Sequence, residues 1–119
     1  KGRYGAPRIH AELVVQGQEL ITADSATLKL TAVAQWKVAD AKQYHDAADN
    51  PHQALYTLVQ LALRRVIGGM ELDAVIEQKA DFGKTLLNDV KADALAELGI
   101  EVVRVEIRDV MLGSDLKGV

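Results

Sequence analysis

The 119-residue sequence contains no cysteine and few residues that carry catalytic chemistry. The absence of cysteine excludes disulfides, thiolate metal sites and a cysteine nucleophile. The only serines are Ser25 and Ser114, and neither lies in the Gly-x-Ser-x-Gly pattern of a hydrolase nucleophile. The pair Gly68-Gly69 is not followed by the Lys-Ser or Lys-Thr of a phosphate-binding loop. We therefore expect no catalytic residues, no cofactor and no enzyme activity.

The sequence also lacks an excess of basic residues and lacks long apolar runs. Fourteen basic residues face seventeen acidic ones, which gives a net charge of −3 and argues against a nucleic-acid partner. No apolar stretch approaches the roughly 20 residues of a membrane-spanning helix. The chain begins at Lys1-Gly2-Arg3, with no signal peptide and no initiating methionine. We expect an excised, soluble fragment of a longer protein.

Histidine is the remaining source of metal or acid–base chemistry, and the chain has three: His10, His45 and His52. His45 with Asp46, or with Asp49, offers a pair of metal ligands. No His-Glu-x-x-His motif and no convergent set of carboxylates completes such a site. The pattern favours solvated surface histidines over a metal centre.

The first half of the chain alternates apolar and polar residues, as strands do. A strand is predicted over residues 9–15, broken by Gly17 and resumed over 19–22, with a turn at Asp24-Ser25. The clearest strand spans 27–38. We expect Trp36 on its apolar face to be a core anchor rather than a ligand platform shared with Tyr44. The apolar face of this strand comprises Leu28, Leu30, Ala32, Ala34, Trp36 and Val38.

Helical signals follow. Asp40 is expected to cap a short helix, with Gln43 placed as in a capping box. Asn50-Pro51 predicts the start of a longer helix, which Gly68-Gly69 ends. We expect a left-handed conformation at Gly68, with Gly69 as the alternative. A further short helix around residues 72–76 and a long one over 81–98 are predicted by helical spacing.

Gly99 terminates that long helix and precedes a last strand over residues 100–110. Val103, Val105 and Ile107 are expected on the buried face, and Arg104, Glu106 and Arg108 on the solvated face. The charged row either keeps the strand soluble or pairs with a neighbouring protomer. It is our candidate protomer interface, and Trp36, Gly68 and Gly99 are the candidate structural residues.

The order of elements, strands then helices then one long strand, predicts an α+β fold. We expect a small, mostly antiparallel sheet packed against several helices. Residues 1–18 would form a leader and first strand, and residues 19–112 the core domain. Residues 113–119 would be the start of a C-terminal extension or a frayed end.

Three segments resemble a known family. Residues 19–28 look like its segment in which a short strand ends in Thr-x-Asp. Residues 57–73 resemble its helix junction of Leu-Arg, an apolar pair, glycine and Leu-Asp. Residues 99–110 are similar to its Gly-Ile strand that ends in Val-Glu-Ile-Lys-Asp-Val. Together they resemble the stomatin, prohibitin and flotillin family (SPFH, or band 7), nearest the stomatin or slipin branch. The sequence departs from the family pattern at Leu112-Gly113, where leucine-proline is usual, and at Leu98, where tryptophan is usual.

The resemblance implies an α+β scaffold domain rather than an enzyme. Family members assemble into large membrane-bound oligomers, organise membrane microdomains and modulate channels or membrane proteases. The expected partners are therefore further copies of the chain, a membrane reached through an N-terminal segment outside this sequence, and a membrane channel or protease. The alternative is a small soluble ligand-binding or hydrolytic domain that shares only the fold class.

Overall fold

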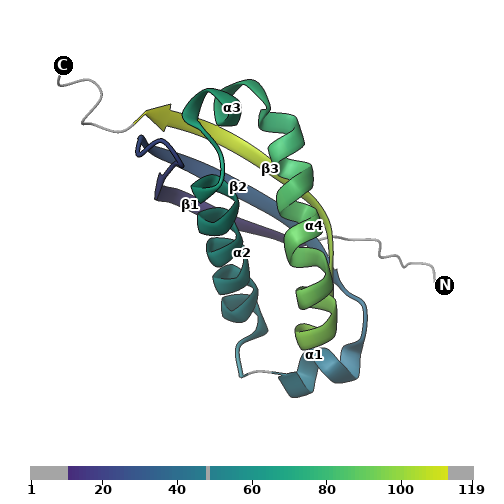
Figure 1. Ribbon diagram of the computed structural model, residues 1–119. Helices are drawn as coiled ribbons and strands as arrows, with labels where there is room; N and C mark the ends of the chain where they lie inside the picture. The colour runs from purple at the N-terminus through teal and green to yellow at the C-terminus, as the bar shows by residue number, and fades with distance from the viewer. Residues whose placement is uncertain (1–10, 48, 113–119) are drawn as a thin grey trace.

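The computed structural model describes residues 11–47 and 49–112, and this part of the chain forms an antiparallel sheet covered by helices on one face (Figure 1). Helices α2 and α4 lie side by side across the sheet, with α1 at one end and α3 at the other. This arrangement confirms the α+β class. The elements are β1 (Ala11–Ile21), β2 (Thr27–Val38), α1 (Ala41–Ala47), α2 (Pro51–Gly68), α3 (Leu72–Glu77), α4 (Lys79–Leu98) and β3 (Ile100–Leu112).

The strand order is β1-β2-β3, so β2 is central and pairs antiparallel with both neighbours. In register, Leu13 of β1, Ala34 of β2 and Val105 of β3 lie side by side. The face that carries them packs against the helices and supplies half of the core. Its buried residues are Leu13, Val15, Leu20, Leu28, Leu30, Ala32, Ala34, Trp36, Ile100, Val102, Val105 and Ile107. Val38, which was expected to share this face, is 43% exposed at the end of β2.

Gly17 does not break the first strand, as the sequence suggested. β1 runs through it, and the register with β2 shifts between Val15 and Gln18. Gly17 takes a φ of +62°, which a residue with a side chain adopts only with strain, so the glycine forms a β-bulge. Beyond the bulge, Gln18 faces the helices and its side chain accepts a hydrogen bond from Gln60 of α2 at 3.0 Å.

The register of β3 also differs from simple alternation. The pairing with β2 shifts between Gln35 and Trp36, and Val102 is buried where Val103 was expected. Val103 is only half-buried, so its predicted place on the core face is wrong. A second shift lies between Lys29 and Thr31, close to Asp109, whose φ is +55°. Strict alternation of buried and exposed residues along β3 therefore holds only between these two register shifts.

Helix α2 begins as predicted. The side chain of Asn50 accepts a hydrogen bond from the backbone N–H of Gln53 at 3.1 Å, and Pro51 occupies the first turn. The left-handed conformation predicted at Gly68 is wrong. Gly68 is the last helical residue, and Gly69 follows with φ −99°, so neither glycine has a positive φ. The buried face of α2 comprises Leu55, Val59, Ala62, Leu63 and Ile67.

Helix α4 begins two residues before the predicted position and ends as predicted. Gly99 takes φ +65°, and its N–H bonds to the carbonyl of Leu95 at 3.1 Å. A Cβ at Gly99 would lie 2.6 Å from the carbonyl oxygen of Asp40 and 2.8 Å from Cβ of Gln43. Only glycine fits at this junction. The buried residues of α4 are Phe82, Gly83, Leu86, Val90, Ala94 and Leu98.

The same junction places α1. The Gly99 carbonyl accepts hydrogen bonds from the N–H groups of Ala39 at 2.8 Å and Asp40 at 3.0 Å. Asp40 caps α1 through the N–H of Gln43 at 3.1 Å, as predicted. The Gln43 side chain, however, does not complete a capping box. It donates to the Glu97 carbonyl at 3.1 Å and satisfies the end of α4 instead.

Candidate interaction surface

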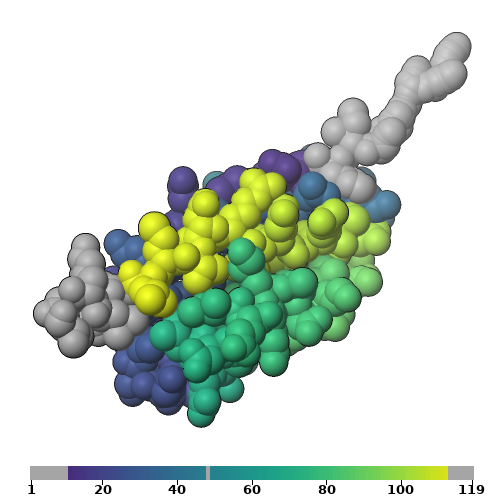
Figure 2. Space-filling view, turned by 90° about the horizontal axis from the view of Figure 1, so that it is seen from above, coloured from purple at the N-terminus to yellow at the C-terminus, as the bar shows by residue number. Residues whose placement is uncertain are grey.

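The charged row of β3 lies on the sheet face opposite the helices. Arg104, Glu106 and Arg108 are all exposed, because the alternation of β3 in this stretch turns Val105 and Ile107 toward the core. Figure 2 shows the atoms of β3, in yellow, exposed along the molecule beside those of the green helices. On the central strand, the residues in register with the row are Gln35, Val33 and Thr31.

Within the row, Arg108 donates to the Glu106 carboxylate at 2.9 Å. Both side chains are about half exposed, so this ion pair adds little stability. Arg104 forms no ion pair within residues 11–47 and 49–112. The row therefore presents one unpaired cation next to one compensated pair.

One half-exposed valine lies near the row on the same face. Val14 of β1 is 46% exposed, whereas its register neighbour Val33 of β2, which lies opposite Glu106, is buried at 3%. Glu12 and Arg104 lie on either side of Gln35. An exposed valine with charged neighbours is compatible with a protein–protein contact.

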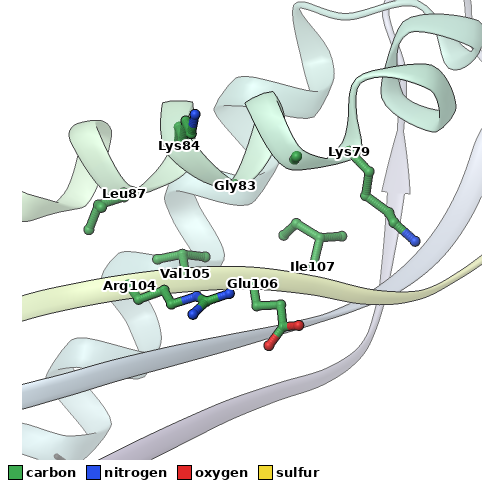
Figure 3. Close-up of a pocket in the computed structure, with 9 residues that line it drawn as sticks. Lys79, Gly83, Lys84, Leu87, Arg104, Val105, Glu106 and Ile107 are labelled. Atoms are coloured by element: carbon green, nitrogen blue, oxygen red, sulfur yellow. The ribbon is translucent and has the colours of Figure 1, made fainter.

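A groove lies between α4 and the helix-facing side of β3 (Figure 3). Its volume is about 470 Å³. Val105 and Ile107 form an apolar floor, and charged side chains stand at the margins. The residues that line the groove are Lys79, Ala80, Gly83, Lys84, Leu87, Arg104, Val105, Glu106 and Ile107.

Trp36 is buried, with 7% of its surface exposed, and belongs to the core. Its ring stacks on Tyr44 of α1 with centroids 6.2 Å apart, and His52 lies at 6.5 Å. The Trp36 Nε1 atom is buried and has no hydrogen-bond partner in the described structure. The aromatic group therefore joins β2 to the ends of α1 and α2.

The other candidates for chemistry lie apart from one another. His45 is at the end of α1, and the neighbouring Asp46 forms an ion pair with Lys42 at 3.9 Å. Ser25 occupies the β1–β2 turn at φ +67°. His10 and Ser114 lie outside the described residues. Within the described ranges, no group of three or more His, Cys, Asp or Glu side chains is placed to hold a metal ion.

Asp24 was assigned to a turn but makes a longer-range connection. Its carboxylate accepts hydrogen bonds from the Thr22 hydroxyl and, at 3.2 Å, from the backbone N–H of Leu72 at the start of α3. The Thr22 hydrogen bond is the main cause that lowers the pKa of Asp24 below its ordinary value of 3.8. Desolvation opposes this shift, and the hydrogen bond from Leu72 makes a smaller contribution that lowers the pKa further. The β1–β2 turn is thereby tied to the α2–α3 loop, which also accepts from Ala23 through the Met70 carbonyl at 2.8 Å.

Comparison with known proteins gives the family. The model of the SPFH domain / Band 7 family matches residues 8–118. This chain belongs to the SPFH/Band 7 family. It is 34% identical over 103 residues to human stomatin-like protein 3 and 30% identical over 100 residues to mouse stomatin. It is 32% identical over 102 residues to an uncharacterised protein of Methanocaldococcus jannaschii.

Each of these matches covers 84% of the chain but only part of the relative: 34%, 35% and 50%, respectively. The chain thus spans half or less of the length of these relatives. Of the helices in the described ranges, none is both long and apolar enough to cross a membrane.

The structure gives physical roles to two motifs of this SPFH domain. The Thr-x-Asp segment is the hydrogen-bonded turn of Thr22 and Asp24, and the Gly-Ile step is the tight junction at Gly99. Sequence reasoning missed the groove beside β3. The available signal was Gly83, an isolated glycine in a helical pattern, which costs helix stability and can have a packing reason.

Proposed function

We propose that this SPFH domain is a non-enzymatic scaffold domain of a membrane-associated, stomatin-like protein. In this proposal the protein assembles from copies of itself, organises membrane microdomains and modulates a membrane channel or a membrane protease. The family match over residues 8–118 is the observation that carries the proposal. Stomatin and stomatin-like proteins among the relatives support it.

The exposed charged row supports the assembly part of the proposal. A strand face with exposed charges of both signs suits weak, orientation-specific contacts between protomers. Charges arranged in this way fix the register of a contact more than they add affinity. We propose that Arg104, Glu106 and Arg108 form one such contact.

Weak contacts suffice when modules are linked. In a longer chain that also carries a membrane anchor and a coiled coil, the effective concentration of neighbouring domains rises and avidity follows. We therefore propose that strong assembly requires segments beyond the present sequence. Membrane attachment would also be supplied by those segments.

Light scattering after size-exclusion chromatography tests this proposal. The 119-residue chain should be a monomer or weak dimer at micromolar concentration, whereas a longer form with its flanking segments should form a large oligomer. A stable high-order ring formed by the chain alone, or a monomeric longer form, would contradict the proposal. A hydrolase activity that disappears on mutation of His45, His52 or Ser25 would contradict the non-enzymatic role.

A further inference from the structure

The sheet has an outer face, opposite the helices, that no helix covers in the described part of the chain. Helices α2 and α4 both pack on the other face (Figure 1). An antiparallel sheet can leave one face in water, and that face then carries polar side chains. On the outer face of this sheet the charged side chains are sorted by strand.

Negative charge lies along β1 and unpaired positive charge on β3. The exposed charged residues of β1 are Glu12 and Glu19, and neither forms an ion pair with another described residue. On β3, Arg108 is paired with Glu106 at 2.9 Å, which leaves Arg104 as the uncompensated cation of the row. The two edges of the outer face therefore carry opposite uncompensated charges.

Glu12 and Arg104 lie at the same height along the strands. Glu12 is in register with Gln35 of β2, and Gln35 is in register with Arg104. The central strand separates the two charges, whose backbones are about 10 Å apart across two strand spacings. They form no ion pair with each other. Each charge is thus available to a partner that approaches the face.

We propose that the outer face binds the same face of a second copy of the chain, about a twofold axis that runs parallel to β2. This rotation exchanges the positions of β1 and β3 and leaves the height along the strands unchanged. Glu12 of each copy then faces Arg104 of the other copy, so one operation forms two identical ion pairs. The inference rests on the proposed assembly function and identifies the surface that meets the charged row.

The dimensions and the symmetry fit this arrangement. Stacked sheets lie about 10 Å apart, a distance that a glutamate and an arginine side chain span together. A twofold axis perpendicular to the strands, in the plane of the interface, would stack β1 on β1 and oppose two acidic edges. A head-to-tail contact would pair one Glu12 with one Arg104 and leave the second pair open. The axis parallel to β2 satisfies both.

The central strand meets its own copy at the axis. Lys29 lies near Lys29 of the second copy, but each has Glu19 directly opposite it on β1, so positive and negative charges alternate there. Val33 and Thr31 are already buried, at 3% and 8% exposure, and offer little further apolar area. The contact is therefore weak, and its charges fix its orientation more than its affinity.

Sedimentation velocity of the 119-residue chain, from micromolar to millimolar concentration, tests the charge pairing. Glu12→Arg and Arg104→Glu should each weaken dimerisation by about tenfold or more, because two attractive pairs become repulsive. The double variant Glu12→Arg/Arg104→Glu exchanges the signs and should dimerise close to wild type. The matched controls Asp93→Arg and Arg64→Glu make the same charge changes at exposed positions of the helices and should dimerise like wild type. Circular dichroism and thermal melts establish that each variant is folded.

Cross-linking locates the axis, since the chain has no cysteine. Gln35 lies on the central strand and meets Gln35 of the second copy. The variant Gln35→Cys should therefore form a disulfide-linked dimer rapidly under mild oxidation. The control Ala92→Cys, which places an exposed thiol on α4, should cross-link much more slowly.

A wild-type chain that stays monomeric at millimolar concentration would overturn the proposal. So would a double variant as weak as the single variants, equal weakening in the helix controls, or equal cross-linking of the two cysteine variants. Assembly of the longer form is measured separately. An unrestored double variant beside a large oligomer of the longer form would refute the twofold contact alone, whereas a restored dimer beside a monomeric longer form would refute the scaffold function alone.

Discussion

The carboxylate of Asp24 accepts a hydrogen bond from the backbone N–H of Leu72 across 48 residues of sequence, and so connects the β1–β2 turn to α3. The Thr22 hydroxyl donates to the same carboxylate. These contacts favour the ionised form of Asp24 in the folded state.

Acid should therefore remove part of the stability that Asp24 contributes. Its pKa is lowered by folding, so the unfolded state binds more protons in acid. The contribution is fully present well above pH 3.8 and is lost as the pH falls through the folded pKa. The difference in unfolding free energy between wild type and Asp24→Asn should shrink as the pH falls below that value. Urea titrations over a pH series, with Asp93→Asn as control, measure it. A difference independent of pH would contradict the assignment.

Gly99 and Gly68 should respond in opposite ways to substitution by alanine. Gly99→Ala adds a Cβ at φ +65° against the Asp40 carbonyl, so we expect a loss of about 2 kcal/mol or more. Gly68 is helical with nothing within 4 Å of its Cβ position, so Gly68→Ala should be neutral or stabilise by up to about 1 kcal/mol. Thermal melts of both variants check this. Equal destabilisation by the two changes would show that the junction geometry is wrong.

Trp36 should behave as a packing residue. Trp36→Ala should cost about 3–5 kcal/mol of unfolding free energy, the range for large aromatic truncations in cores. Trp36→Phe should cost clearly less, because Nε1 has no hydrogen-bond partner and only packing is lost. Chemical denaturation followed by circular dichroism separates the two variants. A Trp36→Ala variant as stable as wild type would remove Trp36 from the core.

The regular parts of this fold were predictable because local signals act alone there. The alternation over residues 27–38 is uninterrupted, and β2 has those bounds. Asn50 and Pro51 carry the cap and the first turn of α2 in two adjacent residues. The sequence pattern marks Gly99 as a helix terminator, and the structure shows that role.

The irregular parts were not predictable because one residue pattern fits two geometries. Gly17 suits both a strand break and a bulge, and only pairing with β2 selects the bulge. Val102 and Val103 are adjacent, and the register shift opposite Gln35 decides which one is buried. Either Gly68 or Gly69 would end a helix, and local sequence does not show that neither takes a positive φ.

Of the two candidate surfaces, the charged row of β3 was predictable from the sequence and the groove between α4 and β3 was not. The row of Arg104, Glu106 and Arg108 was visible as strand alternation and is exposed in the structure. The groove depends on the contact of Gly83 with Val105, which are 22 residues apart and meet only when α4 packs on β3. No local pattern brings α4 and β3 together at this point, so the groove could be found only from the fold.

The central claim is that this SPFH domain is an assembly module whose protomers meet through the row on β3. The most direct measurement is the mass distribution, by mass photometry, of the longer membrane-associated form carrying Arg104→Glu/Arg108→Glu. The matched control is Lys42→Glu/Lys91→Glu, and circular dichroism of the 119-residue chain verifies folding of each variant. We expect the large oligomer to be lost or much reduced in the row variant and retained in the control. A folded row variant that assembles like wild type would contradict the claim.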